Sequence, residues 1–255
     1  MSEVIYEVRD RVGYITLNRP EQRNAINKDM AEGLFGALED VKKNPEVWVC
    51  LITGNGKDFS TGHDLNWTSP QIGSGRSTED LYDYLMNIWK PTVVAINGHC
   101  LAQAAGIACS CDIRIAADDA KLGWPQSKRG IPSTSGPSIL AGIIPFNLAM
   151  QFLYTGDFVE AEEALRLHLV NMVVSASKLV EEADHFIRTK ILPNAPLAMR
   201  IMKEVAVRGR HMTLPDRVRF AGAARARAEA GEDFKEGIVA FLEKRKPSWI
   251  VEKQG

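Results

Sequence analysis

The stretch VWVCLITGNGKDFSTGHDL, residues 47–65, decides how this chain folds. Its first part, residues 47–52, is short and entirely apolar, which is typical of a strand covered on both faces. Its last part, residues 58–65, is a glycine-containing turn that can leave the backbone N–H of His63 unpaired and directed into a cleft. An amide aimed at a carbonyl oxygen is half of an oxyanion hole, so we expect a second amide from another strand-to-turn junction.

The elements before this stretch have clear signatures. Residues 4–8 and 12–17 alternate apolar and polar side chains, which predicts a β-hairpin. A polar loop follows over residues 18–25. Asn27 can then cap a helix in which apolar residues recur at helical spacing.

The elements predicted after this stretch alternate between helices and strands. A mobile surface loop is predicted over residues 69–78 and a helix from about residue 79 to residue 89. Apolar strands are predicted at residues 92–96 and 113–117, with an alanine-rich stretch at 101–109 between them. Strands that alternate with helices indicate a parallel sheet built from crossover connections.

Beyond Pro145 the pattern becomes almost entirely helical. The segments with helical periodicity are residues 161–169, 178–191, 196–207 and 233–244. We therefore expect an α/β unit before Pro145 and an α-helical remainder.

Composition restricts the classes of function. The 255 residues are 45% hydrophobic and 25% charged, as in soluble globular proteins. The net charge of −1 predicts no nucleic-acid partner. We expect no membrane association and a cytoplasmic location, because neither a signal peptide nor an apolar run of ~18 residues is visible. The four cysteines lack metal-ligand spacing, so we expect buried thiols and no metal site.

Five segments of the chain resemble the enoyl-CoA hydratase/isomerase, or crotonase, superfamily. They are LNRPEQRNAIN (17–27), DFSTGHDL (58–65), INGHCLAQAAGIACSCDIRIAADDAKLG (96–123), LYTGDFVEAEEALRLHLV (153–170) and GIVAFLEKRKPSW (237–249). Each segment alone is a weak signal, but the five occur in the family's order and span most of the chain.

The resemblance implies an α/β fold, a spiral of ββα turns with a helical C-terminal region that mediates trimerisation. We assign residues 1–195 to the spiral core and residues 196–255 to the C-terminal helical region. The resemblance also implies an acyl-CoA thioester as substrate, no separate cofactor, and a homotrimer or a dimer of trimers.

By the same resemblance, the two oxyanion-hole amides belong to His63 and Gln103. They would stabilise the enolate that forms when the thioester substrate loses a proton from its α-carbon. Loss of one such donor typically raises a barrier by about 2.7–4 kcal/mol. Gln103 lies near the start of the alanine-rich helix, where the helix dipole favours negative charge.

Substrate contacts carry over from the family position by position. The loop at Arg23 and Ala25 would contact the nucleotide end of CoA. The turn residues Ser60, Gly62, Asp64 and Leu65 would line the pantetheine and thioester. Phe241 and Lys244 match positions that reach the adenine and phosphate of CoA in related hydratases.

The sequence departs from the family at the proton-transfer positions. Hydratases place two glutamates where this chain has Gly106 and Gln126. Neither residue exchanges protons near neutral pH, although a glutamine amide can orient water or a substrate carbonyl. The second oxyanion motif is also unusual, because Gln103 stands between two alanines where glycine is common. A side chain there implies either unstrained backbone at that residue or a narrowed acyl pocket.

Several side chains near the expected cleft have two open interpretations. An imidazole is a side chain suited to proton transfer, so the ring of His63 could act in catalysis, or only its amide matters. Asp64 is expected to bond the turn's backbone amides. Trp124 is either an acyl-pocket wall or a core aromatic. The hydroxyl cluster of residues 133–135, Ser133, Thr134 and Ser135, could hold a water or a carboxylate. The acidic residues Glu79, Asp80 and Asp83 could reach the cleft, but we expect them to form a solvated helix face.

Three functions follow as hypotheses. The first is a lyase or isomerase that acts on an acyl-CoA through a thioester enolate. The second is decarboxylation, as in methylmalonyl-CoA-decarboxylase-like relatives, or C–C bond cleavage; decarboxylation forms an enolate without a base. The third is a catalytically silent relative that binds CoA esters.

Overall fold

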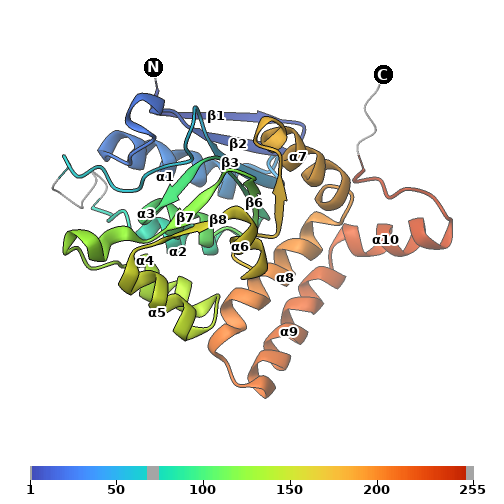
Figure 1. The fold of residues 1–255 in the computed structure, drawn as a ribbon. Helices are drawn as coiled ribbons and strands as arrows, with labels where there is room; N and C mark the ends of the chain where they lie inside the picture. The colour runs from blue at the N-terminus through green and yellow to red at the C-terminus, as the bar shows by residue number, and fades with distance from the viewer. Residues whose placement is uncertain (1, 68–74, 251–255) are drawn as a thin grey trace.

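The computed structural model describes residues 2–67 and 75–250 (Figure 1). A six-stranded sheet with the order β1-β2-β3-β4-β6-β9 forms its centre, and a smaller sheet has the order β5-β7-β8. β1 runs antiparallel to β2, and the pairs from β2 to β9 are parallel. The strands are β1 (Val4–Arg9), β2 (Val12–Leu17), β3 (Val49–Gly54), β4 (Thr92–Ile96), β5 (His99–Leu101), β6 (Ile113–Ala117), β7 (Lys121–Gly123), β8 (Phe158–Glu160) and β9 (Met172–Val174).

Helices cover the sheet and extend beyond it. α1 lies against the N-terminal strands, and α8, α9 and α10 project away from the sheet at the other end of the chain (Figure 1). The helices are α1 (Lys28–Lys43), α2 (Asp80–Met86), α3 (Gln103–Cys109), α4 (Ser135–Ser138), α5 (Phe146–Thr155), α6 (Ala161–Arg166), α7 (Leu179–Phe186), α8 (Pro196–Arg208), α9 (Leu214–Glu229) and α10 (Glu232–Leu242).

The predicted N-terminal elements are confirmed. The hairpin forms as β1 and β2, and the strands expected at residues 92–96 and 113–117 are β4 and β6. Asn27 caps α1, since its side-chain oxygen accepts a hydrogen bond of 2.9 Å from the backbone N–H of Met30. β4 is buried along its whole length, as expected for a central parallel strand.

The expectation of an almost entirely helical remainder after Pro145 was wrong in two places. β8 and β9 lie in that part of the chain, and β9 extends the main sheet beside β6. Each is only three residues long, which is too short for a periodicity signal. α9 was also missed, because its small and charged residues form a weak apolar stripe. Most of the loop predicted at 69–78, namely residues 69–74, lies outside the described residues.

The sheet order brings two loops to one edge. β3 and β4 are parallel neighbours, so the segments after both strands leave from the same end of the sheet. The amide of Ser60 donates to His99 O at 3.0 Å, and the amide of Leu101 donates to Ser60 O at 3.0 Å. The two strand-to-turn junctions expected from the sequence therefore lie side by side. Among the described residues, no helix has the length and apolar character that crossing a membrane requires.

Candidate active site

A cavity of about 500 Å³ opens where these two junctions meet. Thr61, residues 63–65 and residues 101–103 line one part of it, which we call the amide wall. Side chains of Glu79, Tyr82, Gln126, Thr134 and Ser135 line another part, which we call the side-chain wall.

Gly62 allows the two segments of the amide wall to approach each other. Its φ of +89° is a conformation that favours glycine. A Cβ at this residue would lie 2.7 Å from Leu101 O and 3.1 Å from the amide nitrogen of Gln103. Any side chain would therefore clash with the facing junction. The absence of a Cβ brings the Gln103 amide close to the residue that precedes His63.

The amides of His63 and Gln103 are both free of protein acceptors within residues 2–67 and 75–250. His63 pairs with Ile26 in an isolated parallel bridge, in which the neighbours Gly62 O and Asp64 N–H make the hydrogen bonds. The His63 amide is thus left out of the bridge. Gln103 is the first residue of α3, where an amide has no partner inside the helix.

The residue before Gln103 carries the backbone strain of the second junction. Ala102 has φ 54° and ψ −115°, a conformation that L residues rarely adopt. Its amide donates to Gly123 O at 2.7 Å, which fixes the turn to β7. Of the two alternatives from the sequence, unstrained backbone at Gln103 is what the structure shows, since the strain lies one residue earlier.

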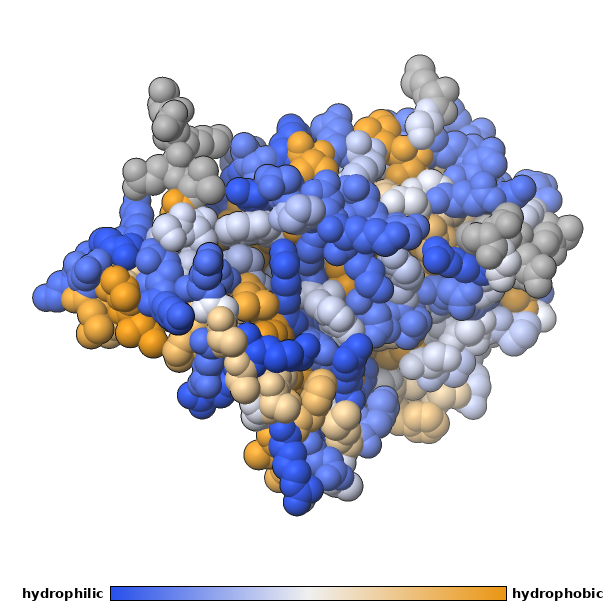
Figure 2. Space-filling view, turned by 180° about the vertical axis from the view of Figure 1, so that it is seen from behind, coloured by the Kyte–Doolittle hydropathy of each residue, from blue (hydrophilic) through white to orange (hydrophobic). Residues whose placement is uncertain are grey.

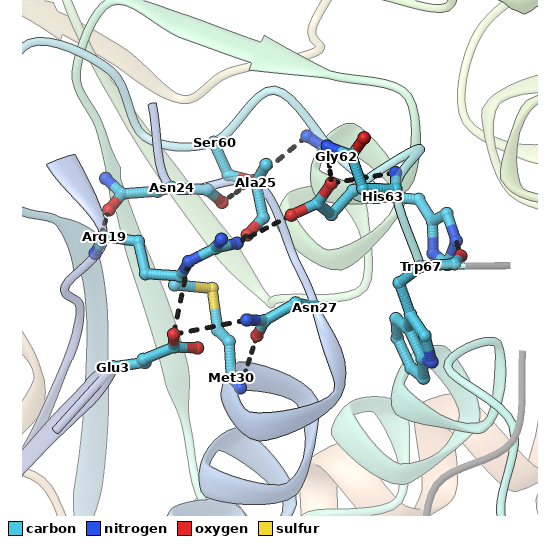
Figure 3. A network of polar contacts seen from close by, with 12 residues as sticks. Glu3, Arg19, Asn24, Ala25, Asn27, Met30, Ser60, Gly62, His63 and Trp67 are labelled. Carbon is cyan, nitrogen blue, oxygen red and sulfur yellow. Dashed lines mark hydrogen bonds and ion pairs between the residues drawn. The ribbon is translucent and has the colours of Figure 1, made fainter. Parts of the chain in front are cut away.

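A buried network holds the loop after β2 against the amide wall (Figure 3). The Ser60 hydroxyl donates to Asn24 O at 2.7 Å and accepts from the amide of Gly62 at 3.1 Å. Asn24 donates through its side chain to Asp58 O at 2.7 Å. Arg19 donates to Ala25 O at 2.5 Å. These contacts cross between segments that lie far apart in the sequence and so fix the position of the turn.

Asp58 anchors the base of the turn. Its buried carboxylate accepts hydrogen bonds from Arg23 Nε at 2.7 Å and from the amide of His99 at 2.9 Å. The ring nitrogen Nδ1 of His99 lies 2.8 Å from the same carboxylate. Burial alone would raise the pKa of Asp58, but these hydrogen bonds outweigh it and lower the pKa to about 2.

The His63 ring is turned toward Trp67 (Figure 3). The two rings stack with centroids 5.1 Å apart, and Nε2 of His63 lies 2.8 Å from Trp67 O. A carbonyl oxygen only accepts, so Nε2 carries a proton in this contact. Asp64 accepts from the amide of Asn66 at 3.0 Å and from Arg19 at 3.1 Å, and these contacts lower the pKa of its carboxyl.

Tight packing surrounds Gly106 on α3. A Cβ added there would lie 2.4 Å from the Cβ of Ser135 and 2.8 Å from Cε1 of Tyr82. The Ser135 hydroxyl donates to Ala102 O at 3.2 Å and accepts from the indole N–H of buried Trp124 at 3.2 Å. Tyr82 and Ser135 thus leave no room for a side chain at Gly106.

Gln126 brings a neutral amide to the cavity. Its Nε2 donates to Ser133 Oγ at 3.2 Å, which also accepts from the amide of Gly136 at 3.0 Å. The side-chain oxygens of Gln126 and Gln103 are buried and have no partner among the described residues. An acyl group with a hydrogen-bond donor could satisfy them.

The structure brings most, but not all, of the predicted site residues together. Those that line the cavity are His63, Gln103, Gln126, Arg23, Ala25, Asp64, Leu65 and Thr134. Those packed directly behind it are Ser60, Gly62, Gly106, Trp124 and Ser133. Phe241 and Lys244 lie apart from it, at the end of α10, where Phe241 lines a separate apolar cavity with Trp249.

Among the lining residues outside the predicted set are Tyr82, Arg129 and Glu79, the last of which was expected on a solvated face. The expectation that the acidic residues at the start of α2 form a solvated face was wrong for Glu79. The spacing of Glu79 and Tyr82 was a usable signal, because residues three apart share a helix face and an apolar-faced Tyr82 would carry Glu79 to the same side. No group of His, Cys, Asp or Glu side chains in the described ranges could hold a metal ion.

Comparison with known proteins defines the class. The sequence profile of the enoyl-CoA hydratase/isomerase family matches residues 7–252. The chain is 36% identical over 252 residues to the (E)-benzylidenesuccinyl-CoA hydratase of Thauera aromatica, covering 96% of this chain and 98% of that protein. It is 33% identical over 253 residues to the short-chain-enoyl-CoA hydratase of Clostridium acetobutylicum, covering 96% and 97% of the two chains.

The fold agrees with this class. The crystal structure of enoyl-CoA hydratase EchA1 from Mycobacterium marinum superposes with a TM-score of 0.91 at 30% identity and covers 98% of this chain and 99% of that one. The chain therefore belongs to the enoyl-CoA hydratase/isomerase family, the crotonase superfamily. The predicted family and the predicted mixed α/β fold with a helical C-terminal region are confirmed.

Proposed function

We propose that this protein binds an acyl-CoA and stabilises the enolate of its thioester with the backbone amides of His63 and Gln103. The observation that carries the proposal is that both amides are free and lie at adjoining junctions of one cavity, with the Gln103 nitrogen 3.1 Å from the position of a Gly62 Cβ. Two donors fixed before the reaction stabilise developing negative charge without reorganisation.

The cavity also offers a route for the CoA moiety. Arg23 is half exposed at the cavity and is held by Asp58, so it presents a fixed positive charge. Leu65 exposes 64% of its surface beside the amide wall. A cation at the mouth suits the phosphates of CoA, and an apolar side chain suits pantetheine.

The side-chain wall argues against ordinary hydration. A hydratase needs a group that takes a proton from water and a group that gives one to carbon. At Gln126 the wall offers an amide, and at Gly106 it offers no side chain. The chemistry that the cavity favours is therefore reaction at the α-carbon of the thioester, by a lyase or isomerase other than a two-glutamate hydratase. No separate cofactor is required for that chemistry.

Decarboxylation or C–C bond cleavage is a second candidate, favoured by Arg129. This residue lines the cavity, and the one hydrogen bond of its guanidinium within the described chain goes to Pro125 O at 3.4 Å. A cation without a carboxylate partner could hold a carboxylate on the acyl group. Loss of CO₂ from such a group would leave its electron pair on the α-carbon as the same enolate. Turnover of a malonyl-type CoA, followed by mass spectrometry, separates this reaction from proton abstraction.

The amide of Gln103 can be tested directly. Gln103→Pro removes this N–H at the first position of a helix, where proline is tolerated. We expect the exchange of acetyl-CoA α-protons with D₂O to slow ~100–1,000-fold. Gln103→Ala retains the amide and should lose far less activity.

Melting temperatures of both variants establish that they fold. Equal exchange in the proline and alanine variants would contradict the role of the Gln103 amide. If wild-type protein binds acetyl-CoA but neither exchanges its protons nor turns over an acyl-CoA panel, the protein is a silent binder. That panel should contain enoyl, 3-hydroxyacyl, malonyl-type and β-keto thioesters.

We also propose a homotrimer, or a dimer of trimers, assembled through the C-terminal helices. Figure 2 shows an apolar patch over α10, where Phe241 is 83% and Leu242 is 71% exposed. Such exposure on one helix marks an interaction surface. In an oligomer, Phe241 and Lys244 could reach a CoA bound by a neighbouring subunit. Light scattering with Phe241→Asp tests the assembly, and a wild-type monomer would contradict it.

A further inference from the structure

Enolate formation by proton abstraction needs a group that accepts the proton. Two carboxylates of the described chain line the cavity, Asp64 on the amide wall and Glu79 on the side-chain wall. Asp64 is committed to its contacts with Arg19 and Asn66, as described above. Proton uptake there would break these hydrogen bonds to the charged form.

The other titratable groups of the cavity are poor acceptors. Burial raises the pKa of Tyr82, so its phenol stays protonated. The Nε2 atom of His63 is bonded to Trp67 O. Arg23 and Arg129 remain positively charged. Glu79 is left as the carboxylate that can gain a proton without losing an ion pair.

The surroundings of Glu79 suit this task. Its one hydrogen bond in the described ranges comes from Thr78 Oγ1 at 3.5 Å, and no ion pair of the described residues includes it. Glu79 has helical φ and ψ at the N-cap of α2, so its side chain shares a face with Tyr82 one turn later. Both residues line the same cavity, and the charge of Glu79 adds to burial, the larger cause, in raising the pKa of Tyr82.

Tyr82 links Glu79 to the rest of the cavity. Its ring and the side chain of Ser135 both pack against Gly106, since a Cβ there would lie 2.8 Å from Cε1 of Tyr82 and 2.4 Å from the Cβ of Ser135. Ser135 in turn bonds Ala102 O, next to the free amide of Gln103. The carboxylate of Glu79 therefore enters the cavity from α2, beside the part of α3 that carries the amide wall.

We propose that Glu79 is the proton-transfer residue of this protein, a catalytic carboxylate supplied by the start of α2. The proposal rests on the enolate chemistry proposed above. The Glu79 carboxylate takes a proton from the α-carbon, and the C–H electron pair forms the C=C bond of the enolate. The thioester C=O pair moves to its oxygen, which the two amides hold. Protonated Glu79 then returns the proton to the α-carbon, or to the γ-carbon of an unsaturated acyl chain, which amounts to isomerisation.

Exchange of α-protons tests this assignment. Acetyl-CoA and butyryl-CoA are incubated in D₂O with wild type, Glu79→Gln and Glu79→Ala, and deuterium uptake is read by mass spectrometry. We expect wild type to exchange at least one probe and both variants to lose ~100-fold or more. Formate should partly restore exchange to Glu79→Ala, since it supplies a carboxylate in the vacated space. A residue that only supports the fold would not be rescued in this way.

Asp83→Asn is the matched control, because Asp83 is an exposed carboxylate of the same helix outside the cavity lining. It should exchange at the wild-type rate. The proposal would be overturned if Asp83→Asn lost as much exchange as Glu79→Gln, or if Glu79→Gln exchanged at the wild-type rate.

The proposed oxyanion hole is tested separately, by the infrared stretching frequency of a ¹³C-labelled thioester carbonyl bound to the protein. If wild type shifts this stretch but exchanges neither probe, the Glu79 assignment is wrong and the oxyanion hole stands. If no shift occurs on binding, the proposed function itself fails, and the role of Glu79 fails with it.

Discussion

The two walls of the cavity differ in what they are made of. The amide wall presents main-chain groups fixed by a buried network through Ser60, Asn24 and Asp58. The side-chain wall presents a phenol, hydroxyls, an amide and one carboxylate, and its Gln126 carbonyl has no partner in the described chain. The difference teaches that the groups proposed to stabilise charge and the group proposed to move protons come from separately built parts of the fold. Reaction type can change at the second wall while the first stays intact.

The largest effect is expected from Gly62→Ala, which breaks the amide wall. The new Cβ would meet Leu101 O at 2.7 Å in a left-handed backbone. We expect the free energy of unfolding to fall by ~2–4 kcal/mol and α-proton exchange to fall ~100-fold or more. Denaturant unfolding and mass spectrometry measure the two effects.

Gly130→Ala is the control for that substitution. Gly130 has a similar positive φ of 67°, but no atom lies within 4 Å of its would-be Cβ. Gly130→Ala should lower the free energy of unfolding by only ~1–2 kcal/mol, because it places an alanine in a left-handed backbone conformation. Equal losses in the two variants would mean that the close approach of the two junctions is unimportant.

Next in size is Asp58→Asn, which weakens the anchor beneath the amide wall. The variant loses the charged contacts to Arg23 and His99. We expect it to lower the free energy of unfolding by ~2–3 kcal/mol, because the carboxylate is buried. Asp157→Asn removes an exposed pair with Lys128 and should have little effect. If the two variants have the same free energy of unfolding, the buried network does not stabilise the turn.

At acid pH, wild type and Asp58→Asn should have the same free energy of unfolding. The folded-state pKa of Asp58 is lowered to about 2 from an ordinary value of 3.8. A lowered carboxyl pKa adds stability above the unfolded-state pKa, and this stability is lost as the pH falls toward the folded-state pKa. The stability gap should therefore be constant above pH ~5 and shrink between pH ~4 and ~2. A gap that does not change over this range would show that the charge of Asp58 contributes nothing.

The sequence predicted the amide wall better than the side-chain wall. The apolar strands and the glycine turn identify the wall, since main-chain positions follow from strand ends and from Gly62. The side-chain wall depends on which residues of α2 and of the segment around Ser135 face α3. That is set by tertiary packing, so Glu79 was assigned to a solvated face. The three-residue strands β8 and β9 were missed for a related reason, since only their neighbours in the sheet define them.

The smallest expected effect has the opposite sign and refines the account of the amide wall. Ala102→Gly relieves the φ of 54° and ψ of −115° at the second junction. We expect the free energy of unfolding to rise by ~1 kcal/mol, with exchange activity retained. Ala105→Gly, in the interior of α3, should instead lower it by about 1 kcal/mol. Destabilisation by both variants would show that Ala102 is not strained.

The central claim is that the amides of His63 and Gln103 hold the thioester oxygen. The most direct test is the infrared stretch of [1-¹³C]acetyl-CoA bound to wild type, Gln103→Ala and Gln103→Pro. Two donated hydrogen bonds weaken the carbonyl bond, so the stretch should move to lower wavenumber in wild type and in the alanine variant. The proline variant should show a smaller displacement, because it lacks one of the two donors. A carbonyl stretch unchanged on binding, or displaced equally in the alanine and proline variants, would contradict the claim.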